Sequence, residues 1–227
     1  MENKLVLAID NSLEYLSIAI SAGEEILEER KIKGRESPSQ IIAEEVFEML
    51  KKRNLKAQDL GLLVGTTGPG SFTGIRVALG FLKGMKIGLG IPLVGVPTLD
   101  CISYAFSFMD GYHILPVLDA KKGEVFCALY FSSRGQLQRL SAYEAKKPEE
   151  IKEMLRKPCF VVGSGVPLVS SSLKGEGVIL AEKVLRHVPM AVAIRLGLER
   201  QKVGSENVVP VYGRRSEAEI KFNLYLT

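Results

Sequence analysis

Short apolar runs alternate with amphipathic stretches along the whole chain, and this pattern predicts an α/β protein. Residues 5–9 are continuously apolar, which is typical of a strand buried on both faces. Ser37-Pro38 is a favoured helix start, and apolar residues recur at helical spacing after it. The elements predicted for this half are strands at 5–9, 15–20, 25–32, 60–64 and 92–96 and helices at 37–53, 73–88 and 98–108.

The same order of elements begins again after residue 112. Asp10 ends the first strand of the chain, and Asp119 ends the first strand after the restart. Three antiparallel strands followed by alternating helices and strands in each half favour a duplicated α/β unit, with lobes at 1–110 and 111–207. The elements predicted for the second half are strands at 113–118, 124–131, 135–142, 159–162 and 177–180 and helices at 148–156, 167–173 and 190–200.

A glycine-dense loop joins the strand at 60–64 to the helix that follows. Such a loop lets the backbone approach a phosphate closely and directs free helix N–H groups at it. Gly70 is not followed by the lysine of a P-loop, and Gly68, Gly70 and Gly74 are spaced one residue too long for a dinucleotide fingerprint. The loop is therefore either a phosphate site of another kind or a tight turn without a ligand.

Three glycines form one bare ridge on the helix after this loop. Gly80, Gly84 and Gly88 recur every four residues and so share one face. A glycine inside a helix costs about 1 kcal/mol relative to alanine. We therefore expect another backbone to approach the ridge closely. That backbone belongs either to this chain's own sheet or to a helix of a partner.

Composition and single residues narrow the possible functions. The net charge of +4 and the pI near 8.9 permit contact with nucleic acid without arguing for it. Cys101, Cys127 and Cys159 are widely spaced, which predicts ordinary thiols in a reducing compartment rather than disulfides or a zinc site. His113 and His187 are isolated, so no metal site is predicted. We expect neither a signal peptide nor a membrane span, and hence a cytoplasmic protein.

Five segments of the chain together form a recognisable pattern. They are Asp10-Asn11-Ser12, Gly68 to Arg76, Gly95-Val96-Pro97-Thr98-Leu99, Asp119 to Phe126 and Pro210-Val211-Tyr212. In this order over nearly the whole chain, they resemble the TsaB (YeaZ) family. Proteins of this family are the dimerisation subunit of the bacterial machinery that makes N6-threonylcarbamoyladenosine beside the tRNA anticodon. The resemblance implies a duplicated actin-like, sugar-kinase or Hsp70-type (ribonuclease H-like) fold of two lobes, with the tail at 208–227 rejoining the first lobe.

The resemblance implies a scaffold without catalytic residues of its own. Family members pair with the catalytic subunit TsaD, the ATPase TsaE joins them, and tRNA is reached through the complex. Because an uncovered apolar strip promotes association, we expect the chain alone to form a homodimer through the same face. The implied contact uses the first two long helices, at Ile42, Val46, Met49, Arg76, Gly80, Gly84 and Gly88.

A nucleotide site is the second question that the resemblance raises. In kinases of this fold, an aspartate at the end of the first strand helps to bind Mg–nucleotide, and Asp10 and Asp119 occupy that place in the two halves. They either belong to a surviving site or cap turns. The resemblance requires no cofactor of this chain but allows ATP or ADP at the interface of the complex. The candidate site comprises Asp10, Asn11, Ser12, Gly68, Gly70 and Asp119.

Two further alternatives remain open. An ATP-dependent sugar or carboxylate kinase of the same fold would bind Mg-ATP tightly and would depend on Asp10. Arg76, in the first turn of the glycine-ridged helix, could hold a partner or a phosphate. It could equally form a salt bridge that keeps the glycine loop closed.

Overall fold

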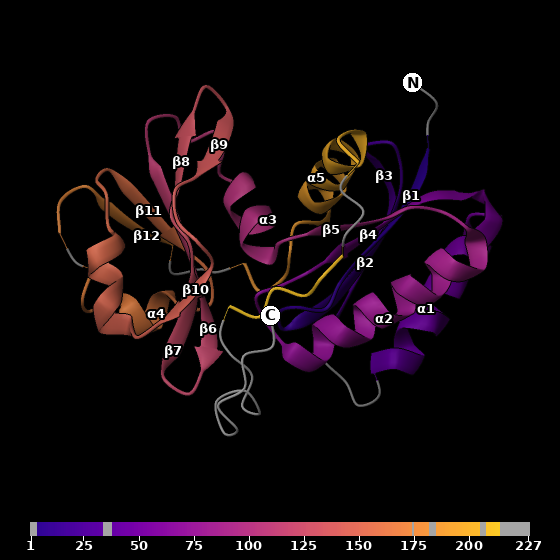
Figure 1. Ribbon diagram of the computed structural model, residues 1–227, viewed down its shortest axis with the longest axis horizontal. Coiled ribbons are helices and arrows are strands. Elements are labelled where there is room, and N and C mark those ends of the chain that lie inside the picture. Colours follow the sequence, from indigo (N-terminus) through magenta and orange to yellow (C-terminus); the bar gives the residue numbers. More distant parts are fainter. Residues whose placement is uncertain (1–3, 34–37, 174, 182–184, 205–207, 214–227) are drawn as a thin grey trace.

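The computed structural model describes residues 4–33, 38–173, 175–181, 185–204 and 208–213, which form two lobes side by side (Figure 1). The first part of the chain contains β1 (Leu5–Asp10), β2 (Tyr15–Ala22), β3 (Glu25–Lys33), α1 (Pro38–Lys52), the 3-10 helix η1 (Ala57–Asp59), β4 (Leu60–Thr66), α2 (Phe72–Leu89), β5 (Leu93–Val96) and α3 (Thr98–Tyr104). The second part contains β6 (His113–Lys121), β7 (Glu124–Cys127), β8 (Tyr130–Ser133), β9 (Gln136–Arg139), β10 (Glu144–Lys146), the 3-10 helix η2 (Pro148–Met154), β11 (Cys159–Val162), α4 (Val166–Val169), β12 (Val178–Ala181) and α5 (Met190–Lys202).

The first sheet has the strand order β3-β2-β1-β4-β5 and is covered by helices on both faces (Figure 1). β1 pairs antiparallel with β2 and parallel with β4. Leu7 and Ile9 of β1 belong to the core beneath α1 and α2, whereas Val6 and Ala8 belong to the core beneath α5. This two-sided burial explains why β1 is continuously apolar.

The second sheet repeats the first strand by strand. Its order is β10-β7-β6-β11-β12, with β8 paired to the start of β6 and β9 paired to β8. β6 and β7 are antiparallel, and β6, β11 and β12 are parallel, as in the corresponding positions of the first sheet. The duplicated, actin-like two-lobe α/β fold predicted from the sequence is therefore confirmed.

Several predicted elements, most of them in the second half, were wrong in their bounds. The strand expected at 124–131 is two strands, because β7 pairs with the far end of β6 and β8 with its beginning. The third position of the second sheet is filled by β10 rather than by the strand expected at 135–142. The helix expected at 148–156 is a 3-10 helix, and the helix expected from Thr98 ends at Tyr104.

Helix α5 returns to the first sheet, although the sequence placed it in a second lobe at 111–207. Met190, Ala193 and Ile194 pack in one core with residues of β1, β4 and β5. Gly197 lies so close to Val64 that a Cβ there would be 2.5 Å from a valine methyl carbon. α5 thus covers the face of the sheet opposite α1 and α2 (Figure 1).

The described part of the tail, residues 208–213, also returns to the first lobe. Val208 joins the core beneath α1 and α2, and the Val211 amide donates to the Thr67 carbonyl at 2.7 Å. The remainder of the predicted tail, and Ser37 at the predicted helix start, lie outside the described residues. Within the described ranges, no helix combines the length and the apolar character that crossing a membrane requires.

Candidate functional site

The two long helices of the first lobe lie next to each other on one face of the sheet (Figure 1). The Ser71 side chain caps the start of α2 by accepting a hydrogen bond from the Gly74 amide at 3.2 Å. Gly90 ends the helix in the left-handed conformation, with φ of 67°. Ile75 and Leu82 of α2 are fully buried against the sheet, which turns the glycine ridge outward.

The glycine ridge of Gly80, Gly84 and Gly88 is open. A Cβ atom placed on any of these three glycines would meet no atom of the described residues within 4 Å. The ridge therefore does not pack on this chain's own sheet, and that interpretation of the three glycines was wrong. The glycines form the floor of a shallow groove of about 490 Å³, which Ala57, Phe81, Met85 and Leu89 also line.

Large apolar side chains are exposed on the same two helices. Phe47 of α1 is 62% exposed, and Phe72 and Ile87 of α2 are 43% and 84% exposed. The Lys51 ammonium lies 5.9 Å from the centre of the Phe47 ring. Together with the groove, these side chains form the apolar part of the described surface of α1 and α2.

The predicted contribution of Ile42, Val46 and Met49 to a partner contact was wrong. Their exposed fractions are 0%, 3% and 0%, and all three pack in the core of the first lobe. The apolar stripe of α1 covers its own sheet. Phe47 points the other way, so it is the apolar side chain of this stretch that a partner could reach.

Arg76 ties the described tail to the start of α2. Its Nε donates a hydrogen bond to the Tyr212 hydroxyl at 3.1 Å, and its guanidinium carbon lies 3.9 Å from the centre of the Phe72 ring. The rings of Phe72 and Tyr212 are 5.0 Å apart. The hydrogen bond and the cation–π contact hold Arg76 at one end of the helix face.

Asp10 lies in a closed, buried turn at the end of β1. Its Oδ1 accepts hydrogen bonds from the Ser12 amide at 3.0 Å, the Ser12 hydroxyl at 2.5 Å and the Thr66 hydroxyl at 2.6 Å. Burial raises the pKa of Asp10 above its ordinary value, although these hydrogen bonds act in the opposite direction. The other carboxyl oxygen, Oδ2, has no hydrogen-bond partner among the described residues.

The glycine loop closes over this turn. The Ser71 amide donates to the Ser12 carbonyl at 2.8 Å. A Cβ on Gly70 would collide with the same carbonyl oxygen, and one on Gly74 would collide with the carbonyl oxygen of Asn11. The close approach that these glycines permit is an approach to the chain's own backbone.

Gly68 makes the same kind of close contact, with the tail. A Cβ there would lie 2.6 Å from the Val211 carbonyl oxygen. The structure therefore brings together the first five residues of the candidate nucleotide site, but it packs them against one another. Whether a nucleotide binds there stays a prediction. These five residues are Asp10, Asn11, Ser12, Gly68 and Gly70.

Asp119, the sixth residue of the candidate nucleotide site, is in the other lobe. Its carboxylate accepts from the Lys121 ammonium at 2.8 Å and from the Lys121 amide at 2.7 Å. Burial alone would raise the pKa of Asp119, but the contacts with Lys121 outweigh it and lower the pKa. The Ser164 hydroxyl accepts from the Asp119 amide at 3.1 Å, so a glycine-rich loop also lies against the end of β6.

Some residues that line the groove were not predicted from the sequence. Phe81 lines the groove one position after Gly80, so helical spacing could have identified it. Ala57 reaches the groove from η1, and no sequence pattern indicates that.

The cysteines and potential metal ligands lie apart from this surface. Cys101, Cys127 and Cys159 are buried, and burial raises the pKa of Cys127 and of Cys159 to about 12. In the described ranges, no three His, Cys, Asp or Glu side chains gather as they would around a metal ion.

Comparisons with known proteins agree with one another. The protein-family model of TsaD, tRNA N6-adenosine threonylcarbamoyltransferase, matches residues 34–161, more than half of the chain. The tRNA threonylcarbamoyladenosine biosynthesis protein TsaB of Bacillus subtilis is 28% identical over 224 residues, covering 96% of this chain and 97% of that protein. The protein of the same name from Escherichia coli is 29% identical over 224 residues, covering 94% of this chain and 96% of its own.

A solved structure shares the fold. YeaZ from Pseudomonas aeruginosa matches with a TM-score of 0.75 and 22% identity, and the match covers 92% of this chain and 99% of that one. The chain therefore belongs to the TsaB (YeaZ) family, within the wider protein family that the threonylcarbamoyltransferase model describes.

Proposed function

We propose that this chain is a non-catalytic scaffold and activating subunit in tRNA threonylcarbamoyladenosine biosynthesis. It binds a TsaD-type catalytic subunit through the outer face of α1 and α2, and a TsaE-type ATPase joins the pair. The observation that carries this proposal is the glycine ridge, which faces away from the chain's own core and is open at Gly80, Gly84 and Gly88 of α2.

The geometry of the ridge suits a partner helix. Without Cβ atoms at Gly80, Gly84 and Gly88, the backbone of a second helix can approach α2 more closely than ordinary side chains allow. Burial of Phe47 and Ile87 under the partner supplies the hydrophobic driving force. The stretch that matches the TsaD family model includes both helices, which supports a partner of similar build.

The same face explains the homodimer that we propose for the free chain. Exposed Phe47 and Ile87 beside an apolar groove favour association with whatever complementary surface is present. A second copy offers that surface when the catalytic subunit is absent. The catalytic subunit therefore competes with self-association.

The buried turn at Asp10 supports a binding role over the kinase alternative. A kinase of this fold needs this carboxylate at an accessible phosphate site, whereas Asp10 is buried and accepts from Ser12 and Thr66 of its own chain. We propose that the chain requires no nucleotide of its own. ATP or ADP, where the complex uses it, binds at the interface between subunits.

The test is Gly84→Arg in a co-purification experiment with the TsaD-type subunit. The new side chain enters open space in the free chain, so the fold is retained, but it occupies the place of the partner's backbone. We expect affinity to fall by more than about tenfold, as for a substitution at the centre of an interface. Calorimetry then gives the dissociation constant of the complex, and the unfolding midpoint shows whether the variant is folded.

Gln138→Arg is the matched control, because it adds the same side chain at an exposed position of β9 in the second lobe. It should bind the catalytic subunit like the wild type. Full binding by a folded Gly84→Arg variant would show that the partner uses another face.

A further inference from the structure

Helix α3 lies between the lobes and belongs to both cores. Leu99 and Ile102 pack with residues of the second sheet, including Ile114 and Phe126. Cys101, on another side of the helix, packs in the core that α5 forms with the first sheet. Movement of one lobe against the other would therefore act directly on α3.

Asp100 of α3 is bound from both sides of this junction. Its Oδ1 accepts hydrogen bonds from the Tyr130 and Tyr143 hydroxyls, each at 2.7 Å, and both tyrosines come from the second lobe. Its Oδ2 accepts from Arg200 Nη2 of α5 at 2.8 Å. Arg200 Nη1 also donates to the Gly95 carbonyl of β5 at 3.1 Å, which fixes the arginine to the first sheet.

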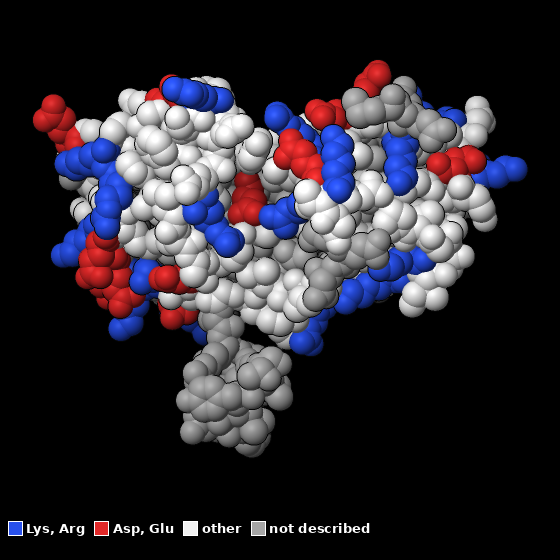
Figure 2. Space-filling view, turned by 45° about the horizontal axis from the view of Figure 1, so that its top comes forward, with Lys and Arg blue, Asp and Glu red and all other residues white. Residues whose placement is uncertain are grey.

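These contacts form the Asp100 network, which comprises Asp100, Tyr130, Tyr143 and Arg200. The surroundings of the network strengthen its hydrogen bonds. The Asp100 side chain is 18% exposed and that of Arg200 is 34% exposed. Burial, followed by the charge of Asp100, raises the pKa of both tyrosines, so both hydroxyls remain protonated donors. Hydrogen bonds to a charged carboxylate are roughly twice as strong as neutral ones. Figure 2 shows acidic and basic side chains meeting in the hollow between the lobes.

We propose that the Asp100 network is a latch that holds the two lobes at one angle. Proteins with hinged lobes close around a ligand by changing that angle. The Asp100 carboxylate accepts from two hydroxyl groups of the second lobe and from Arg200, which is fixed to the first lobe. A change in the angle between the lobes therefore breaks hydrogen bonds to a charged group. The chain then presents its helix face and its second lobe as one rigid body. This inference is independent of the partner proposed above.

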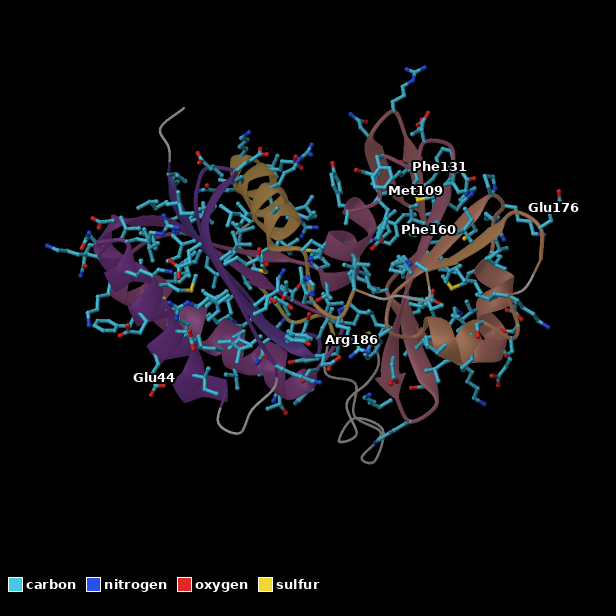
Figure 3. All side chains as sticks on the ribbon, turned by 180° about the vertical axis from the view of Figure 1, so that it is seen from behind. Glu44, Met109, Phe131, Phe160, Glu176 and Arg186 are labelled. Carbon is cyan, nitrogen blue, oxygen red and sulfur yellow. The ribbon has the colours of Figure 1, made fainter. Side chains whose placement is uncertain are left out.

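The experiment measures the interlobe distance directly. Nitroxide labels are placed at Glu25→Cys in the first lobe and Glu176→Cys in the second, both exposed positions; Figure 3 labels Glu176 at the outer end of its lobe. The three native cysteines are buried, so the labels attach selectively. Distances are read by double electron–electron resonance, with labelled chains diluted in unlabelled protein so that pairs within one chain dominate.

Asp100→Ala is the main variant, and Glu28→Ala is its matched control. Glu28 likewise has three side-chain partners, the cationic Arg30, Lys52 and Arg53, but all of them lie in the first lobe. We expect a narrow distribution in the wild type and with Glu28→Ala. With Asp100→Ala we expect a broader distribution and hydrogen exchange of the α3 amides on the order of tenfold faster.

Two milder variants keep the test decisive if Asp100→Ala does not fold. Tyr143→Phe removes one donor from the second lobe, and Arg200→Gln removes the charged donor of α5. Each should broaden the distribution less than the loss of Asp100. An unchanged distribution in folded Asp100→Ala, or in both milder variants, would overturn the proposal, as would equal broadening with Glu28→Ala.

Discussion

Among single residues, the acidic side chains show how strongly position decides chemistry. Asp10 accepts three hydrogen bonds in a buried turn, whereas Asp119, its counterpart in the second lobe, pairs with Lys121 near the surface. Burial raises the pKa of Asp10, and the contacts with Lys121 lower that of Asp119. The repeated backbone therefore preserves the place of the aspartate but not its environment.

Asp10→Asn should remove one part of the pH dependence of stability. The folded-state pKa of Asp10 lies above its ordinary value of 3.8, so its favourable contribution is complete below 3.8 and is lost as pH rises through the folded-state pKa. Asparagine does not titrate. The stability of the variant relative to wild type should thus improve as pH rises through this window, by at most about 1.4 kcal/mol per pH unit. Urea unfolding at a series of pH values measures it.

Glu28→Gln provides a control of opposite sign. Burial alone would raise the pKa of Glu28, but hydrogen bonds from Lys52, Arg30 and Arg53 together lower it. Its contribution is present above the ordinary value of 4.5 and is lost as pH falls through the lowered pKa. A relative stability of Asp10→Asn that declines with rising pH would contradict the assignment for Asp10.

Residue patterns predicted which side chains are apolar and covered better than they predicted what covers them. The spacing of Ile42, Val46 and Met49 correctly indicated one apolar face of a helix. A sequence pattern does not distinguish a face that covers the chain's own sheet from one that awaits a partner, because both are apolar at the same spacing. The structure assigns these residues to the core and leaves Phe47 outside.

At the level of the secondary-structure element, α2 combines a tightly packed inner face with an open outer face. Leu79 and Leu82 fill the space against Gly65 of the sheet, where a Cβ would be 2.8 Å from a leucine methyl carbon. The outer ridge of Gly80, Gly84 and Gly88 has free space above it. Nothing in the described part of the chain therefore requires glycine at the ridge, although each glycine weakens the helix.

Replacing Gly80, Gly84 and Gly88 by alanine should separate stability from binding. Each alanine restricts the unfolded chain and suits the helix, so we expect a total gain on the order of 2 kcal/mol in the free energy of unfolding. The three methyl groups fill the groove and should weaken binding of the TsaD-type subunit. Thermal unfolding at low protein concentration, where dimers dissociate, and a binding titration measure the two effects.

Gly65→Ala is the comparison variant, because it adds a methyl group beneath the inner face of α2. Its Cβ would meet the methyl carbons of Leu79 and Leu82, so it should destabilise the fold by about 1–3 kcal/mol. A triple alanine variant that unfolds as easily as Gly65→Ala would contradict the open geometry of the ridge.

Across the whole molecule, segments far apart in sequence complete each other. Helix α5 and residues 208–213 both return to the first lobe. In the tail, the Tyr212 ring packs at a tilt against Phe72, and its hydroxyl accepts a hydrogen bond from Arg76 at the start of α2. The carboxyl-terminal part of the chain thus stabilises the amino-terminal half.

Tyr212→Ala should reduce the free energy of unfolding by about 1–2 kcal/mol, because it removes an aromatic pair and a cation–π contact. Tyr212→Phe keeps the ring beside Phe72 and loses only the hydroxyl that accepts from Arg76 Nε, so its effect should be smaller. Urea unfolding of the two variants gives both values. Equal losses would indicate that the hydroxyl, rather than the ring, holds the tail.

The sequence indicated the repeat because buried strands and amphipathic helices are local patterns. The Asp100 network gave no such signal, since Asp100, Tyr130, Tyr143 and Arg200 are far apart along the chain and meet only after both lobes form. The same reason explains the error over α5. A helical pattern states which residues of α5 are apolar but not which sheet they cover.

The return of α5 to the first sheet has a consequence for synthesis on the ribosome. Val6, Ala8, Leu62 and Val64 emerge early, yet the helix that shields them ends at Lys202. Throughout translation of the second lobe, this side of the nascent sheet remains without its cover. This side of the amino-terminal half therefore stays exposed until α5 has been synthesised, and exposed apolar surface of this kind promotes aggregation.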